Sequence, residues 1–218
     1  MNITEVQLLT DNLNQTKHFY QQVLGLEMIY SDNTLVSFKA GNSTLSFHSS
    51  YRIDPVYHFA FNIPNNKFEE AMKWVSSSLD LIEITPSNFV AEFTSWNARA
   101  FYFYDNNKNI LEMIARFDLD NRSSRPFDGS VIQSISEMGI VVSNPTQYAS
   151  KLSADFNLPY FSRQAPKDDF IVLGDDEGLC IIVPENRPWY PTTIRSSPFW
   201  SKLSLQQTGT AIPDIVTP

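Results

Sequence analysis

Cysteine is nearly absent from this chain of 218 residues, and its single example is Cys180. One cysteine cannot close a disulfide within the chain, which excludes a disulfide-stapled secreted domain. Long apolar runs are also absent, because no stretch approaches the roughly 18 consecutive apolar residues of a membrane-spanning helix. The opening residues lack the charged segment, apolar run and small-residue cleavage site of a secretory signal. We therefore expect a cytoplasmic protein that does not enter a membrane.

Positive charge is scarce as well. The chain has 16 lysine and arginine residues against 24 aspartate and glutamate residues, and its formal net charge at pH 7 is −8. Proteins that bind nucleic acids hold the phosphate backbone through clustered basic residues, and the sequence has no such cluster. We therefore expect no nucleic-acid partner. Hydrophobic residues make up 42% of the chain, which is enough for a buried core.

A repeated pattern of elements runs through the sequence. Residues 3–9 are typical of a strand, residues 16–24 carry apolar side chains at helical spacing, and Gly25 favours the end of that helix. Three strand-like segments follow, at residues 27–30, 35–40 and 44–48. The order strand, helix, strand, strand, strand defines a βαβββ module.

The same order begins twice more. The second copy has strands at 56–63, 98–104 and 109–115, and the third has strands at 134–142, 160–161, 170–173 and 179–183 with a helix over 146–156. The first strand and the entry to the second are 21 residues apart in each copy: Glu5 to Leu26, His58 to Leu79, and Glu137 to Leu158. The middle copy carries extra residues at about 82–96, where a lid or pocket wall could lie.

Module boundaries follow from composition. Residues 118–129 are rich in charge and contain proline and glycine, so they are typical of a surface linker. We predict paired modules in 1–117, a third module in 130–185, and an extended C-terminal tail in 186–218 without helix or strand.

Two segments resemble a known superfamily. Residues 13–26, LNQTKHFYQQVLGL, and residues 101–113, FYFYDNNKNILEM, resemble the helix and last-strand signatures of the vicinal-oxygen-chelate superfamily of glyoxalases, bleomycin-resistance proteins and extradiol dioxygenases. The DNNKN turn departs from the usual Asp-Pro-Asp-Gly-Asn. The resemblance implies an α+β fold in which two βαβββ modules pair into a curved sheet around a cleft, which leaves the third module here unpaired.

The resemblance also implies a divalent metal held by the first and last strands of each paired module. The matching positions are Glu5, Ser46, His58 and Glu112, of which Glu5, His58 and Glu112 can bind metal. The expected ion is Fe²⁺, Mn²⁺ or Zn²⁺, and two carboxylates move the preference away from zinc towards harder ions. Two ionised glutamates cancel the charge of a divalent ion, so we expect weak attraction for an anionic ligand.

Each candidate ligand has a plainer interpretation. Glu5 could be a solvated residue at a strand end, and His58 a hydrogen-bonded core histidine. Glu112 is the strongest candidate, because an unpaired carboxylate in the apolar strand NILEMIA would be costly. Without a metal, Glu5 and Glu112 could act as a catalytic acid and base pair.

Substrate contacts are expected from Trp96, Arg99 and Tyr102 on the third strand of the second module, although strand aromatics are more often core residues. His48 lies two residues after Ser46 on the same side of a strand, so a shift of register could make it the missing metal ligand, or it could contact substrate. The plainer interpretation is a histidine on the surface or at the cleft rim. Glu137 and Cys180 repeat the positions of Glu5 and Ser46 in the third module. No metal is expected there, because no fourth module completes the site.

The leading hypothesis is a metal-dependent enzyme acting on a small organic molecule with vicinal oxygens, of the lyase, isomerase or ring-cleavage dioxygenase type. The alternative is a metal-free protein of the bleomycin-resistance type, which would sequester a small molecule between aromatic residues such as Trp74 and Trp96. A role as an assembly scaffold is also open. The unpaired third module predicts a homodimer through residues 130–185, because a lone module exposes a sheet edge.

Overall fold

The helix of the first module lies between the two capping residues that the sequence indicated, Asn12 and Gly25. The computed structural model describes residues 1–51, 53–207 and 209–217. Asn12 caps the first helix by accepting a hydrogen bond from the Gln15 backbone N–H, and Gly25 follows it with a φ of +62°. The elements are β1 (Asn2–Thr10), α1 (Leu13–His18), a π-helical turn (Phe19–Val23), β2 (Glu27–Ser31), β3 (Leu35–Ala40) and β4 (Ser43–Ser49).

The second and third modules repeat this order. The second contains β5 (His58–Ile63), α2 (Phe68–Ser76), β6 (Ala91–Phe93), a 3₁₀ turn (Thr94–Trp96), β7 (Ala98–Tyr104) and β8 (Ile110–Arg116). The third contains a 3₁₀ turn (Gly129–Val131), β9 (Ser134–Val142), α3 (Pro145–Phe156), the isolated bridge of Tyr160 with Leu173, β10 (Ile171–Asp175) and β11 (Gly178–Pro184). The prediction of an α+β protein made of tandem βαβββ modules is confirmed.

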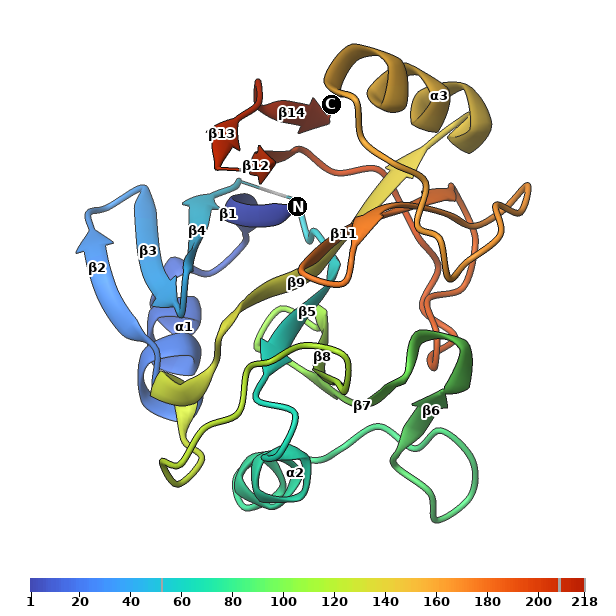
Figure 1. Cartoon of the computed structure of the whole chain (residues 1–218). Helices are drawn as coiled ribbons and strands as arrows, with labels where there is room; N and C mark the ends of the chain where they lie inside the picture. The colour runs from blue at the N-terminus through green and yellow to red at the C-terminus, as the bar shows by residue number, and fades with distance from the viewer. Residues whose placement is uncertain (52, 208, 218) are drawn as a thin grey trace.

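One continuous sheet joins the modules in the strand order β2-β3-β4-β1-β9-β5-β8-β7-β6, with β11 and β10 branching from β9 (Figure 1). β5 and β9 are antiparallel neighbours, and Ala60 lies opposite Glu137. β1 meets β9 only through the pair of Ile3 with Ile135 in the described chain. The second and third modules therefore form the pair. The expectation that residues 1–117 contain the paired modules is wrong.

Burial explains this choice of partners. Every residue of β5 is buried, and so are the central residues of β9, whereas β1 alternates between buried and partly exposed positions. A strand whose two faces are both covered lies in the interior of the protein, whereas a strand whose residues alternate between buried and exposed has one face towards solvent. β1 carries Glu5 and Gln7 at partly exposed positions, which keeps it outside the most buried part of the sheet.

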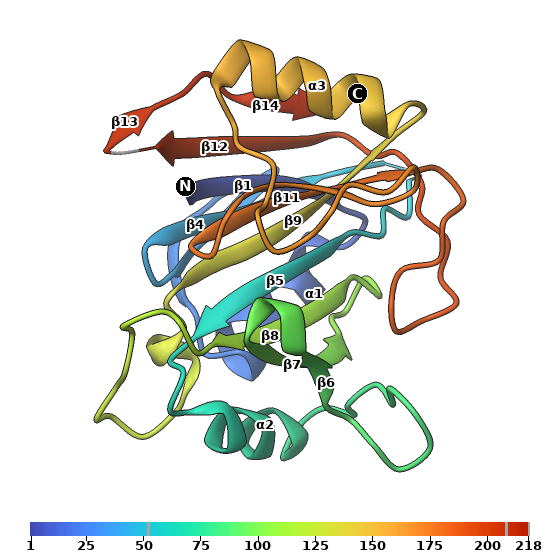
Figure 2. The same ribbon diagram turned by 45° about the vertical axis from the view of Figure 1, so that its right-hand side comes forward.

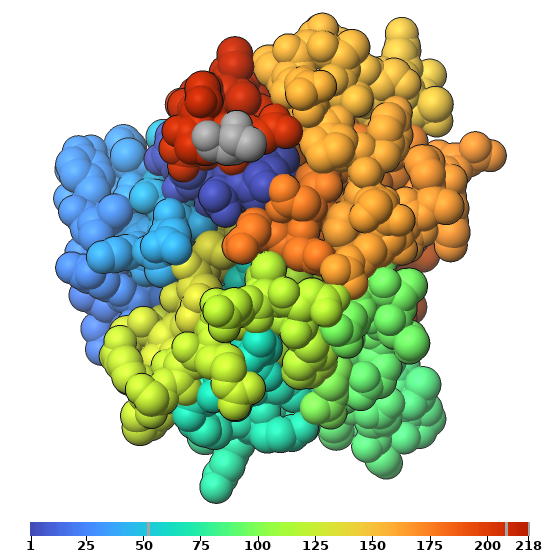
Figure 3. Space-filling model, in the orientation of Figure 1, coloured from blue at the N-terminus to red at the C-terminus, as the bar shows by residue number. Residues whose placement is uncertain are grey.

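The C-terminal tail supplies a strand partner for β1. It forms β12 (Ser201–Gln207), β13 (Thr210–Ala211) and β14 (Ile215–Thr217), and β12 runs antiparallel to β1 with Leu203 opposite Val6. The red C-terminal residues lie against the blue N-terminal strand in Figure 3. The prediction that residues 186–218 lack a strand is wrong. Because the third module has a partner within the chain, the reason for expecting a homodimer through 130–185 is also removed.

The sheet has an outer and an inner face. Helices α1, α2 and α3 each pack on strands of their own module (Figure 2), and the larger hydrophobic cluster lies beneath them. A smaller cluster, which includes Ala60, Tyr102, Ile181 and Trp189, lies on the opposite face of the second and third modules. This inner face surrounds the candidate site. No helix in the described part of the chain is long and apolar enough to cross a membrane.

Candidate metal site and its pocket

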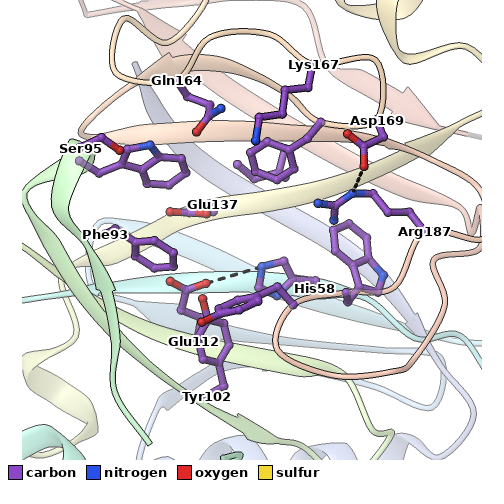
Figure 4. A pocket seen from close by; sticks show the side chains of 15 residues that line it. His58, Phe93, Ser95, Tyr102, Glu112, Glu137, Gln164, Lys167, Asp169 and Arg187 are labelled. Carbon is purple, nitrogen blue, oxygen red and sulfur yellow. Dashed lines mark hydrogen bonds and ion pairs between the residues drawn. The ribbon is translucent and has the colours of Figure 1, made fainter. Parts of the chain in front are cut away.

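A cavity of about 320 Å³ opens on the inner face between the second and third modules. Aromatic side chains form much of its wall, and charged side chains lie at its floor and mouth (Figure 4). The lining residues are His58, Phe93, Ser95, Trp96, Tyr102, Glu112, Glu137, Gln164, Lys167, Asp169, Phe170, Ile181, Arg187, Trp189 and Tyr190. The extra residues of the second module supply Phe93, Ser95 and Trp96, so this insertion forms a pocket wall.

Three potential metal ligands meet in this cavity: His58 on β5, Glu112 on β8 and Glu137 on β9. One nitrogen or oxygen atom from each lies within 4.8 Å of the others, and His58 Nε2 is 3.6 Å from Glu112 Oε2. Strand register brings them together. Ala60 pairs with Glu112 on one side and with Glu137 on the other, and His58 lies two residues earlier on the same face of β5.

The hydrogen bonding of His58 prepares it as a ligand. Its Nδ1 lies 3.0 Å from the Ile110 carbonyl oxygen, which can only accept, so Nδ1 carries the proton and donates. Nε2 then presents a lone pair towards the carboxylates. Burial lowers the pKa of His58 to about 4, so the ring is neutral at pH 7. A neutral imidazole fixed by a backbone carbonyl is the form in which histidine binds metals.

The two glutamates are buried but differ in their partners. Glu112 Oε1 is buried without a hydrogen-bond partner among the described residues, and burial together with the Glu137 charge raises the pKa of Glu112. The Tyr102 hydroxyl opposes this shift by hydrogen bonding to Glu112. Glu137 forms an ion pair with the fully buried guanidinium of Arg116. Burial raises the pKa of Glu137, and Arg116 acts against that rise.

This donor set fits a divalent metal ion. Two carboxylates and a neutral imidazole offer hard oxygen and borderline nitrogen ligands, and Glu112 Oε1, which has no hydrogen-bond partner in the described part of the chain, is free to bind a cation. A cation between the carboxylates would remove the repulsion that raises the pKa of Glu112. Ile181 on β11, which pairs with Gly139 on β9, also lines the cavity, but its apolar side chain cannot bind a metal. A metal held by the three ligands would therefore keep coordination positions open for substrate.

The structure brings together some of the predicted residues. His58 and Glu112 lie in the cavity, and Trp96 and Tyr102 line it. Glu5 does not reach the cavity. Its strand, β1, is separated from β5 by β9, and β1 pairs with β12. The expectation that Glu5 lies in this site is therefore corrected, and Glu137 lies beside His58 and Glu112 instead.

The two other predicted substrate contacts lie elsewhere. Arg99 faces away from the cavity and pairs with Glu69 and Glu92 at 2.9 Å each. It points to the outer face because Ala98 and Ala100 occupy the inward positions of β7. His48 Nε2 lies 2.9 Å from Gln7 Oε1 in the first module, outside the cavity.

Sequence reasoning missed several residues of the site. Glu137 was visible as the repeat position of Glu5, but assigning it required knowing which modules pair. Cys180 is buried in the hydrophobic cluster on the opposite face of β11, and burial raises the pKa of its thiol to about 12. Arg187, Trp189 and Tyr190 come from the tail segment, which showed no pattern pointing to a pocket.

Comparisons with known proteins support the fold. No family model matches the chain, and no curated protein matches it. A structure from Bacillus subtilis, described as a putative dioxygenase, matches 99% of this chain and 69% of its own length at 14% identity and a TM-score of 0.63. At this identity the match is evidence of a shared fold.

Shorter solved structures match about half of the chain. A lactoylglutathione lyase from Agrobacterium tumefaciens covers 51% of this chain and 91% of its own, at 21% identity and a TM-score of 0.42. A glyoxalase/bleomycin resistance protein/dioxygenase from Alicyclobacillus acidocaldarius covers 54% and 92%, at 17% identity and a TM-score of 0.44. The repeated βαβββ modules and their single curved sheet, together with the match over 99% of the chain, show that this chain shares its fold with the Bacillus subtilis structure.

Proposed function

We propose that the chain is a metal-dependent enzyme acting on a small organic molecule with two adjacent oxygen atoms. The observation that carries the proposal is the convergence of His58, Glu112 and Glu137 in one aromatic-walled cavity. A divalent metal held by these residues would supply a Lewis acid that binds and polarises the substrate oxygens. The two carboxylates favour Fe²⁺ or Mn²⁺ over Zn²⁺.

The side chains around the ligands have distinct tasks in this proposal. The Ile110 carbonyl holds the His58 ring in one tautomer. Burial raises the pKa of Tyr102, which keeps its hydroxyl protonated and able to donate a hydrogen bond to Glu112 or to a substrate oxygen. Trp189 and Tyr190 help to exclude water from the cavity.

The reaction belongs to the lyase, isomerase or ring-cleavage classes. Isomerisation requires a base beside a substrate carbon, and the raised pKa of Glu112 suits a group that takes up and releases a proton. Ring cleavage requires redox-active iron and molecular oxygen, and it would use Glu112 as a ligand only. A metal other than iron in the purified protein would therefore exclude ring cleavage, whereas iron is compatible with both classes.

One observation favours a second candidate, a metal-free protein that sequesters a small molecule. Arg116 already neutralises Glu137, His58 is uncharged, and protonation of Glu112 would leave the pocket floor without net charge. An aromatic-walled cavity with a neutral floor can bind an apolar ligand without a metal.

Metal analysis of protein purified without chelators tests the proposal. We expect stoichiometric Fe²⁺ or Mn²⁺, and a lower melting temperature after EDTA treatment because a bound metal stabilises the folded state. The control is Glu5→Gln, which should bind metal as the wild type does. Substoichiometric metal together with an unchanged melting temperature in EDTA would contradict the proposal and support the metal-free alternative.

A further inference from the structure

Two cationic side chains lie at the mouth of the cavity. Lys167 and Arg187 lie across it from Glu112 and Tyr102, and they approach from the loop before β10 and from the segment after β11 (Figure 4). Arg187 forms a 3.2 Å ion pair with Asp169 and lies 5.0 Å over the Phe170 ring. Among the described residues, no carboxylate forms an ion pair with the Lys167 ammonium.

The charge at the mouth is therefore uneven. Lys167 and Arg187 contribute two positive charges and Asp169 one negative charge, which leaves one positive charge in excess. Since Asp169 engages Arg187, the excess is centred on Lys167. A single anionic group of a ligand would balance it.

Arg116 makes the floor of the cavity less negative than its two glutamates alone would make it. The Arg116 guanidinium pairs with Glu137, so His58, Glu112, Glu137 and Arg116 together carry one negative charge when both glutamates are ionised. A divalent ion bound there would leave one positive charge on the floor. The sequence-based expectation that the site attracts anions weakly did not include Arg116.

The walls between floor and mouth select a flat molecule. Phe93 and Trp96 stack with ring centroids 5.5 Å apart, and Trp189 lies 5.2 Å from the His58 ring. Such faces bind planar rings well. A volume of about 320 Å³ is at the small end of ligand pockets and suits a molecule with a single ring.

We propose that this cavity binds a monoanionic aromatic carboxylate, with its carboxylate at Lys167 and Arg187 and two adjacent ring oxygens directed towards Glu112 and His58. The position of the ligand carboxylate is inferred from Lys167 and Arg187 alone. The position of the two ring oxygens rests on the function proposed above.

Calorimetric titration tests the assignment, with 3,4-dihydroxybenzoate as the acidic probe and catechol as the matched probe without a carboxylate. In EDTA-treated protein we expect 3,4-dihydroxybenzoate to bind more tightly than catechol by up to about fivefold, the range of one partly exposed charge contact. Lys167→Met should remove this preference, and Lys167→Arg should retain it. Added salt should weaken the binding of 3,4-dihydroxybenzoate and leave that of catechol unchanged.

Controls separate this inference from the proposed function. Lys73→Met changes an exposed lysine on α2, away from the cavity, and should bind both probes as the wild type does. Equal affinity of the wild type for the two probes, or an unchanged preference in Lys167→Met, would overturn the assignment. A carboxylate preference in a protein that takes up no metal would leave this inference standing while the proposed enzymatic function fails.

Discussion

Glu112 and Glu137 pair with opposite sides of the same residue, Ala60, although they belong to different modules. β8 brings Glu112 alongside β5 in parallel, and β9 brings Glu137 alongside it in the antiparallel direction. Two buried carboxylates thus face each other across a methyl group. This geometry depends on the pairing of the second and third modules.

Glu137→Gln should weaken the binding of Mn²⁺ on the order of 100-fold or more, because even outer partners of metal ligands contribute 10–100-fold. The matched control is Glu5→Gln, which changes the repeat position in the first module and should leave the affinity unchanged. Titration with Mn²⁺ monitored by electron paramagnetic resonance gives both affinities. Weaker binding in Glu5→Gln with normal binding in Glu137→Gln would contradict the module pairing.

Glu112→Gln should stabilise the metal-free protein at pH 8. The pKa of Glu112 is raised in the folded state, so its contribution to stability is complete below its unfolded pKa and is lost as the pH rises through the folded value. Removing this buried charge should increase the free energy of unfolding by about 1–3 kcal/mol at pH 8, with less gain at pH 5. Urea denaturation in EDTA measures the difference. A variant that is destabilised at both pH values would count against a charged, strained Glu112.

His58 should make the metal-free protein less stable in acid. Its folded pKa of about 4 lies below the ordinary value of 6.5, so the unfolded chain takes up a proton first as the pH falls between these values. The loss is up to about 3 kcal/mol. His58→Gln cannot take up this proton, so the difference in free energy of unfolding between wild type and variant should shrink from pH 7 to pH 4.5. Urea denaturation at several pH values measures this difference. Parallel curves of unfolding free energy against pH for the two proteins would disprove the role of His58.

Arg116→Met should destabilise the protein by about 3–5 kcal/mol, because it leaves the buried Glu137 carboxylate without its partner. Arg99→Met is the control, since Arg99 forms ion pairs with the exposed Glu69 and Glu92 and should cost less than about 1 kcal/mol. Chemical denaturation at neutral pH compares them. Equal losses in the two variants would show that Arg116 does not compensate a buried charge.

Leu203→Ala should cost about 2–5 kcal/mol in stability, because Leu203 is fully buried where β12 covers β1. The metal affinity of the cavity should not change, since the substitution lies in a different part of the sheet. Val216→Ala is the control at an exposed position of β14. A stability loss below about 0.5 kcal/mol would mean that the tail does not pack as a strand.

Local patterns in the sequence predicted the modules well. The alternation of side chains along the first strands, the Asn12 cap and Gly25 act over a few residues, so they can be recognised without the tertiary structure. The same is true of His58 and Glu112, which lie in apolar strands where an unpartnered polar group is costly. The strands of the tail were missed because the segment around β12 mixes serine, glutamine and leucine. Its alternate side chains become buried only when β12 pairs with β1.

Three βαβββ modules in a common register, and the strand positions that can carry ligands, follow from the order of residues alone. Which of those positions meet depends on how the strands assemble into the sheet. Three similar first strands offer several pairings of comparable local character, and the choice depends on burial summed over the whole sheet. The fully buried β5 pairs with β9, and the half-exposed β1 pairs with β12. For that reason Glu137 lies in the candidate site and Glu5 does not.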